Sequence, residues 1–257
     1  ANLGDLDGDG VPDLAVGANG DGNVGAVYVV LMNPDRTGKA FQKLSPASGM
    51  PVGFTLDGSD YFGSSVACLG DLDGDGVPDI AVGAHGDGDG ATILKTGAVY
   101  IVLMNPEGTG KAFQKLSTTT GMPAGFTLDY HDNFGYSVAS FGDLDDDGVS
   151  DIAVGAFRDD DGGTETGAVY VVLMNPDGTG KAFQKLSITT GMPVGFTLDD
   201  SDWFGSSIAC LGDIDGDAVP DLAVGAVFDD DGGTDTGAVY IILMNLNGTG
   251  KAFQKLS

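Results

Sequence analysis

Aspartates occupy alternate positions in a short loop near the start of the chain. Residues 5–13 read DLDGDGVPD, and the aspartates at loop positions 1, 3, 5 and 9 are Asp5, Asp7, Asp9 and Asp13. Such carboxylates repel one another and converge only around a cation. Oxygen ligands without His or Cys favour calcium over zinc or copper, and a flexible site with many oxygens favours it over magnesium. The carbonyl of Val11 at position 7 can add a ligand, and Gly10 permits the positive φ of the turn.

The loop recurs three more times, so we expect about one Ca²⁺ per repeat and four in total. The corresponding residues are Asp71, Asp73, Asp75, Val77 and Asp79; Asp143, Asp145, Asp147, Val149 and Asp151; and Asp213, Asp215, Asp217, Val219 and Asp221. Solvated Asx turns are the alternative interpretation of a single copy, but four copies favour a cation. An EF-hand is rejected because the loop lacks a glutamate at position 12 and strands are expected on both sides.

Two copies of the loop depart from the pattern. Asp146 replaces the glycine at position 4, which we interpret as added charge. Ala218 replaces the glycine at position 6, where a positive φ strains any Cβ. The fourth site is therefore predicted to be the weakest.

The loops belong to a repeat of about 70 residues. The sequence KAFQKLS occurs at 39–45, 111–117, 181–187 and 251–257, and GAVY precedes each copy. We divide the single propeller region 1–257 into units 1–45, 46–117, 118–187 and 188–257. The first unit is expected to be truncated, because Ala1 aligns with Ala67.

Each unit is predicted to form four short strands. In the second unit these are 62–70, 79–84, 97–104 and 112–117, which are apolar or β-rich runs bounded by Gly, Asp and Asn. Four antiparallel strands per repeat predict an all-β fold, a β-propeller of four blades. These blades form a closed four-bladed ring or part of a larger assembly. The glycine-rich first strand is expected near the axis, and KAFQKLS at the outer edge.

The unit resembles the FG-GAP repeat of integrin α-subunit propellers. The FG pairs are Phe62-Gly63, Phe134-Gly135 and Phe204-Gly205, and the GA pairs are Gly17-Ala18, Gly83-Ala84, Gly155-Ala156 and Gly225-Ala226. The chain departs from the family in lacking the proline of GAP, in its longer unit, and in having four blades where seven are usual. The resemblance implies calcium sites that stabilise the blades, an extracellular or cell-surface location, and a role in adhesion or assembly.

The charge of the chain limits its partners. It carries 38 acidic and 11 basic residues, for a net charge of -27, so its surface repels nucleic acid and anionic lipid. No apolar stretch reaches the roughly 20 residues that cross a bilayer, so membrane insertion is not expected. The only histidines, His85 and His131, lie at non-equivalent positions without a catalytic motif. No enzymatic activity is predicted.

Three other features of the sequence allow more than one interpretation. Acidic loops at 86–90, 158–167 and 228–237 are interpreted as solvated, although they could hold cations or a basic partner. Aromatic residues beside carboxylates, at Tyr61 and Trp203, resemble sugar sites, but we interpret the neighbouring FG phenylalanines as blade-packing residues. The lysines of KAFQKLS either block strand aggregation or meet acidic loops of a neighbouring subunit.

The two cysteines and one glycosylation sequence complete the candidate features. Cys68 and Cys210 are interpreted as small buried residues without a disulfide. Asn247-Gly248-Thr249 is an acceptor sequence for an N-glycan.

The sequence therefore predicts a non-catalytic, calcium-binding extracellular module for adhesion or structural self-assembly, acting as a surface or filament building block. Its partner would be a protein, a glycan or a second copy in a homo-oligomer or filament. The alternative is a carbohydrate-binding module, and a glycan-active enzyme is less favoured.

Overall fold

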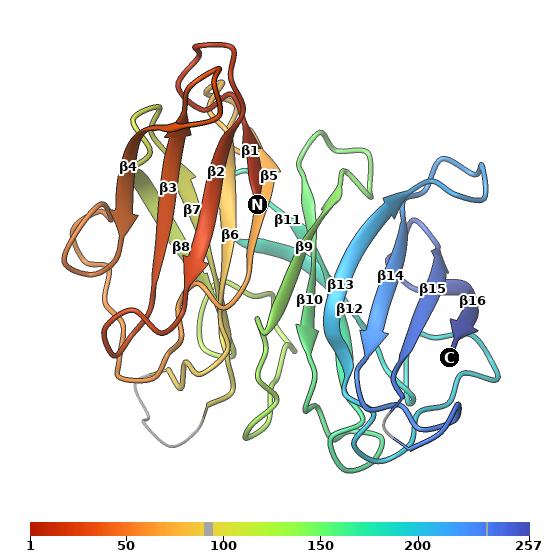
Figure 1. The fold of residues 1–257 in the computed structure, drawn as a ribbon. Helices are drawn as coiled ribbons and strands as arrows, with labels where there is room; N and C mark the ends of the chain where they lie inside the picture. The colour runs from red at the N-terminus through yellow and green to blue at the C-terminus, as the bar shows by residue number, and fades with distance from the viewer. Residues whose placement is uncertain (90–94, 235) are drawn as a thin grey trace.

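The computed structural model describes residues 1–89, 95–234 and 236–257 and is drawn in Figure 1. These residues form four antiparallel sheets of four strands, each in simple sequence order. Within these ranges there is no helix, and so none that could span a membrane. The predicted all-β fold with FG-GAP-like blades is confirmed, and each sheet is one blade.

The strands have closely matching bounds in the four blades. The first blade contains β1 (Asn2–Gly4), β2 (Asp13–Ala18), β3 (Ala26–Met32) and β4 (Gly38–Leu44), and the second contains β5 (Val66–Gly70), β6 (Asp79–Ala84), β7 (Ala98–Met104) and β8 (Gly110–Leu116). The third contains β9 (Ser137–Gly142), β10 (Asp151–Ala156), β11 (Ala168–Met174) and β12 (Gly180–Leu186), and the fourth contains β13 (Phe204–Gly212), β14 (Asp221–Ala226), β15 (Ala238–Met244) and β16 (Gly250–Leu256).

The first strand of each blade lies on the inside of the arrangement. Strand β9 contacts both β5 and β13, and β5 also contacts β1. Strands β4, β8, β12 and β16, which carry KAFQKLS, are the opposite edges of their sheets. The predicted inner and outer strands are therefore confirmed. Narrow residues suit the inner position because the strands of neighbouring blades approach one another there.

Both faces of a middle blade are apolar, because each face packs against another sheet. In the second blade, Val82 and Tyr100 pair across β6 and β7 on the face toward the first blade, whereas Ile101 belongs to the cluster shared with the third blade. Side chains that alternate along a strand point to opposite faces. Three hydrophobic clusters result, one at each junction between consecutive blades.

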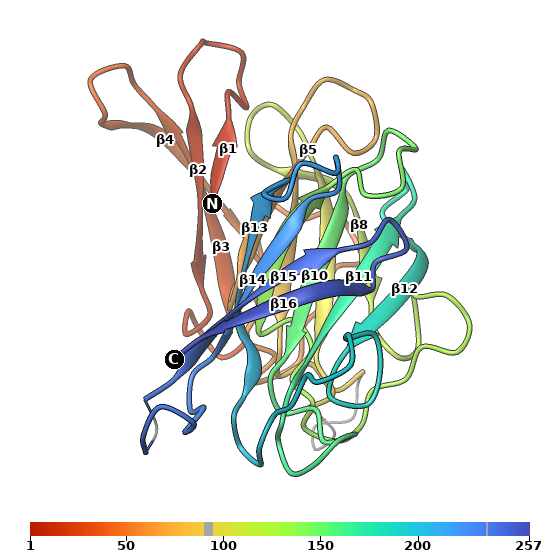
Figure 2. The same cartoon turned by 90° about the vertical axis from the view of Figure 1, so that its right-hand side faces the viewer.

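The four blades form an open arc. In the first blade Val16 is 50% exposed and Phe41 is 65% exposed, and in the fourth blade Val239 is 41% exposed and Leu256 is 54% exposed. The equivalents of Val16, Val239 and Leu256 in the second blade, which are Val82, Val99 and Leu116, are fully buried, and Phe113, the equivalent of Phe41, is half-buried. The two end blades thus each keep one apolar face in solvent. Figure 1 shows them on opposite sides of the molecule, and Figure 2 is viewed from the side of the fourth blade.

The FG and GA glycines meet at the junctions between blades. A Cβ built on Gly83 would overlap the carbonyl oxygen of Gly135, and Gly17 and Gly155 face Gly63 and Gly205 in the same way. The neighbouring phenylalanine is held by a parallel bridge, such as that between Gly97 and Phe134. Phe62, Phe134 and Phe204 are fully buried. Their interpretation as blade-packing residues is confirmed.

The two cysteines are unpaired, as expected. They are half-buried, however, so the interpretation as small buried residues is wrong in this respect. The sulfur of each lies 3.8 Å from a backbone oxygen of the preceding blade, that of Leu3 for Cys68 and that of Phe141 for Cys210. Each cysteine side chain therefore reaches the backbone of the neighbouring inner strand, but the strands do not enclose it completely.

We predict that Gly83→Ala destabilises the chain by about 2 kcal/mol or more, since the new methyl group has to push two backbones apart. Gly225→Ala is the matched control. The equivalent Cβ overlaps only the hydroxyl oxygen of Ser207, which can rotate away, and makes ordinary contacts with the hydroxyl oxygen of Ser206 and the Cβ of Ser207. Urea denaturation of both variants measures the difference. Equal losses of stability would show that the junction does not require glycine.

Candidate metal centre

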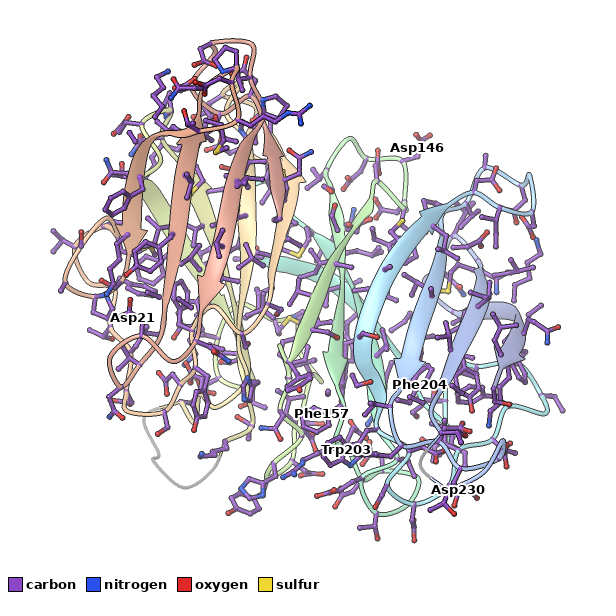
Figure 3. All side chains as sticks on the ribbon, in the orientation of Figure 1. Asp21, Asp146, Phe157, Trp203, Phe204 and Asp230 are labelled. Carbon is purple, nitrogen blue, oxygen red and sulfur yellow. The ribbon has the colours of Figure 1, made fainter. Side chains whose placement is uncertain are left out.

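Three aspartates of the loop converge in the structure, those at positions 1, 3 and 9. A carboxylate oxygen from each lies within 4.8 Å of the others in three groups: Asp5, Asp7 and Asp13; Asp71, Asp73 and Asp79; and Asp143, Asp145 and Asp151. In all three groups the position-9 residue is buried, and the position-1 residue is exposed. The loops lie at one end of the strands, and so along one edge of the molecule, which is marked by Asp146 in Figure 3.

The position-1 aspartate shapes the turn. In the second loop, one oxygen of Asp71 accepts hydrogen bonds from the backbone N–H groups of Gly74 and Asp75 at 2.8 and 2.9 Å. The other accepts from the N–H of Gly76 at 2.8 Å. The turn needs left-handed backbone at positions 4 and 6, where φ is 79° and 89° in this copy.

The position-9 aspartate anchors the loop to the sheet. One oxygen of Asp79 accepts from the N–H of Leu72 at 2.9 Å, and the other accepts from the N–H of Met104 at 2.8 Å. Asp79 therefore joins the loop to the end of β7. Burial raises the pKa of Asp79 to about 6, against the lowering effect of the two N–H donors. A divalent cation beside this carboxyl would favour its ionised form.

The position-3 aspartate has a free oxygen. Asp73 uses Oδ2 for an ion pair with Lys111 at 2.7 Å, while its Oδ1 is buried without a hydrogen-bond partner. Asp145 repeats this arrangement, with Lys181 on Oδ2 at 2.5 Å and Oδ1 unpaired. A buried carboxylate oxygen without a partner is costly. Three carboxylates lie together here, and the lysine pairs with Oδ2 and leaves Oδ1 of the position-3 aspartate without a partner. This set of oxygen donors fits a calcium ion.

The position-5 aspartate and the position-7 valine were also predicted as ligands. Asp75 accepts the N–H of Val77 on Oδ1 at 2.9 Å and pairs with Lys111 through Oδ2. It is not a member of the converging group in the described residues. The same pairing occurs in the fourth loop, where Lys251 lies 2.6 and 2.7 Å from Asp215 and Asp217. Coordination by position 5 and by the valine carbonyl stays a prediction.

The lysines of KAFQKLS pair within their own blade. Lys39 lies 2.6 and 2.7 Å from Asp7 and Asp9 at one edge, and Lys43 lies 2.8 Å from Asp21 at the other. Neither sequence interpretation, aggregation control or contact with another subunit, included this arrangement. The signal was the spacing of four residues, which places both side chains on one face of a strand about 13 Å apart.

The opposite edge holds a second, more buried set of polar contacts. In the second blade Lys115 lies 2.6 Å from Asp87, which also accepts from the hydroxyl of Tyr100 at 2.7 Å. The equivalent region of the third blade includes Asp132, from the linker between the second and third blades. Asp132 is buried, and burial together with the charge of Asp159 raises its pKa to about 7. The acidic loops 86–90 and 228–237 include residues outside the described ranges, at 90 and 235.

Two exposed carboxylate groups also occur at this edge. They are Asp129, Asp160 and Asp161, and Asp199, Asp230 and Asp231. Each combines an aspartate of a linker with two of a second acidic loop. All six residues are exposed. Asp87, Asp159 and Asp229 of the same acidic loops are buried, however, so the interpretation of these loops as solvated is wrong for those three aspartates.

Aromatic side chains form a row along the same edge, which the sequence did not reveal. His85 stacks on Tyr61 and meets Tyr136 edge-on, with ring centroids 4.9 and 5.2 Å apart. The row continues through Phe157 to Trp203, which also contacts Phe228. Figure 3 shows Phe157 and Trp203 at the edge opposite Asp146.

Comparison with known proteins identifies the repeat. A family model described as an FG-GAP-like repeat matches residues 5–82, and one described as an FG-GAP repeat matches residues 134–172 and 204–242. The chain belongs to the FG-GAP repeat family. The matched segments contain all four acidic loops and two of the FG pairs at their start, so the family pattern coincides with the junctions and loops described above.

Integrin α subunits are among the relatives. The chain is 32% identical to integrin alpha-4 of Xenopus laevis over 85% of its own length, and 32% identical to integrin alpha-5 of the same species over 93%. Integrin alpha-PS2 of Drosophila melanogaster is 32% identical over 88% of the chain. The matched regions span 18%, 20% and 15% of these relatives. The FG-GAP chain thus corresponds to about a fifth of an integrin α subunit or less.

We predict that Ala218→Gly stabilises the FG-GAP chain by about 1 kcal/mol, because Ala218 has a φ of 70°. The Cβ positions of Gly10, Gly76 and Gly148 meet no neighbour within 4 Å, so backbone strain alone decides the effect. Gly76→Ala is the reciprocal control and should lose a similar amount in urea denaturation. An unchanged midpoint for Ala218→Gly would contradict the strain.

Asp146 also has a positive φ, of 61°. Its interpretation as added charge alone is therefore incomplete, since it takes the backbone conformation of the glycine that it replaces. Aspartate tolerates this region better than alanine does, so the cost is expected to be smaller than at Ala218.

We predict that Asp132→Asn flattens the pH dependence of stability between pH 7 and 4. In the native chain the carboxyl of Asp132 takes up a proton near pH 7, whereas in the unfolded chain it does so near pH 4. The native state binds the extra proton between these values, so Asp132 makes stability rise as pH falls, by at most about 1.4 kcal/mol per pH unit. Urea denaturation of both proteins at several pH values measures the difference, and parallel curves would contradict the shift.

Proposed function

We propose that this FG-GAP chain is a calcium-binding, non-catalytic module of an extracellular or cell-surface protein, with a role in adhesion or structural assembly. The observation that carries the calcium assignment is the buried, unpaired Oδ1 of Asp73 and Asp145, each beside two further carboxylates. The extracellular setting is supported by the integrin α relatives. Extracellular fluid also supplies enough calcium for sites of modest affinity.

Calcium would act as a clamp within each blade. The aspartates at positions 1, 3 and 9 would hold the ion, and the ion would neutralise carboxylates that otherwise repel one another. Position 9 is already bonded to the end of the third strand through the N–H of Met104 or its equivalents. The ion would thus fix the turn between the first two strands to the third.

A non-catalytic role is supported by the state of the titratable groups. The carboxylates of the loops are engaged by lysines and backbone N–H groups. Burial lowers the pKa of His85 to about 4, so this imidazole is neutral at physiological pH. His131 stacks on Tyr130, with ring centroids 3.7 Å apart. Neither imidazole has the serine or cysteine partner of a nucleophilic site in the contacts described.

The surface that we propose for a partner lies at the edge opposite the calcium loops. A pocket of about 320 Å³ is lined by Glu165, Asp200, Ser201, Trp203, Phe228 and Asp230. Trp203 donates its indole N–H to Glu165 at 3.1 Å. An aromatic floor surrounded by carboxylates suits a lysine or arginine side chain of a protein partner.

The pocket also favours the second candidate function, a carbohydrate-binding module. Aromatic rings pack on the apolar faces of sugars, and carboxylates accept their hydroxyl hydrogens. Binding to a glycan array would support this candidate over a protein partner. Assembly into filaments, the remaining structural role, would be detected as calcium-dependent light scattering.

We predict that chelation of calcium lowers the melting temperature by about 5 to 10 °C for each site that was saturated, since a ligand at 100 times its Kd adds about 2.7 kcal/mol. Scanning calorimetry with and without EDTA measures the loss. Isothermal titration with calcium counts the sites.

Two variants separate the loops from nonspecific charge. Asp73→Asn should remove one site from the titration, whereas Asp35→Asn, in an exposed turn outside the loops, should leave the count unchanged. An unchanged melting temperature in EDTA together with no binding heat would overturn the calcium assignment.

A further inference from the structure

The exposed face of the fourth blade contains a groove of about 810 Å³. Its lining includes Gly225, Val227, Thr236, Gly237, Val239 and Leu256. Three of these residues, Val227, Val239 and Leu256, are large apolar side chains that are 48%, 41% and 54% exposed. The groove is independent of the calcium loops and of the aromatic pocket, and it extends beyond the proposed function.

The three junctions inside the chain show what lies at the equivalent place. At the junction of the third and fourth blades, Gly167 forms a parallel bridge with Phe204, and the N–H of Phe204 donates to the carbonyl of Thr166 at 3.0 Å. The same N–H to carbonyl bond joins Phe134 to Thr96 at 3.0 Å. In the fourth blade the equivalents of the acceptor and the bridging glycine are Thr236 and Gly237, which both line the groove.

The phenylalanine of each linker covers apolar residues of the preceding blade. Phe204 is fully buried in the cluster that contains Val169 and Leu186 of the third blade. Both of these residues are fully buried. Their equivalents in the fourth blade, Val239 and Leu256, have the same side chains and are exposed. The groove therefore has the same apolar residues that a linker phenylalanine covers at the internal junctions, and here they are exposed.

The glycine pattern points to the same occupant. Gly17, Gly83 and Gly155 admit no Cβ, because the FG glycine of the next linker lies against them. Gly225 is their equivalent, and a Cβ there would meet only the side chains of Ser206 and Ser207. An FG pair docked in the groove would place a carbonyl oxygen against Gly225, as in the other three blades.

We propose that the groove on the fourth blade binds a linker segment of this repeat, an extended chain of the type at residues 188–207. Such a segment carries GMPxGFTLD followed by FG. Its FG backbone bonds to Thr236 and Gly237, and its phenylalanine covers Val239 and Leu256. The same backbone bridge and apolar pocket provide recognition when an extended strand adds to a sheet.

The experiment extends the chain after Ser257 with a second copy of residues 188–207, which repeats the connection from Ser187 to Ile188. A short tether keeps the segment near the groove at high effective concentration. Hydrogen exchange of the segment between β14 and β15 is measured by mass spectrometry. We expect exchange to slow by about tenfold or more, as burial of a phenylalanine implies, and the melting temperature to rise.

Two matched controls test the contacts. In one, the added copies of Phe204 and Gly205 are changed to serine and valine, and the rest of the chain is unaltered. In the other, Gly225→Ala is introduced into the extended chain, and its folding is checked first without the extension. Both should lose the slowing and the rise in melting temperature. Equal exchange in the extended chain and both controls, or no slowing in any of them, would overturn the proposal.

Discussion

The contact between glycine backbones at the junctions is the constraint on which the rest of the structure depends. The carbonyl oxygen of Gly135 lies so close to Gly83 that it leaves no room for a Cβ there, and the carbonyl oxygen of Ala98 does the same to Gly135. This approach holds the linker between two sheets and carries Phe134 into the core. The large apolar residues of both blades then pack around that ring. The two letters FG and the two letters GA therefore describe a single contact, made once per junction.

Each blade has one group of lysine–aspartate ion pairs at each end of its strands. Lysines four residues apart on the outer strand reach opposite edges, and each is paired with aspartates there. At the edge with the DxDxDG loops Lys111 is more exposed than Lys115 is at the other edge, with side-chain exposures of 34% and 19%. Exposed ion pairs contribute little to stability. The buried hydrogen bonds from the Met104 N–H to Asp79 and from the Tyr100 hydroxyl to Asp87 hold the loops in place more strongly.

The sequence predicted the strands, their order and the position of the loops, because all of these recur with the repeat. Gly, Asp and Asn between β-rich runs mark the boundaries whatever the partners are. The lysine partners could not be predicted in the same way, since they depend on which loop lies over the outer strand once the sheet twists. The aromatic row was missed for a similar reason. His85, Phe157 and Phe228 differ in type and in exact register, and only the fold places them side by side. The positive φ of Asp146 was missed because aspartate is common in turns of every kind.

Trp203 is the only tryptophan of the chain, and it lies where the third and fourth blades meet. Its indole ring contacts Phe157 of one blade and Phe228 of the other, with Arg158 over its face at 5.2 Å. Its emission changes when these two blades separate, whether the last blade opens alone or the whole chain unfolds. A tryptophan change that precedes loss of the circular dichroism of the strands would therefore mark opening of the last blade before the rest of the chain unfolds.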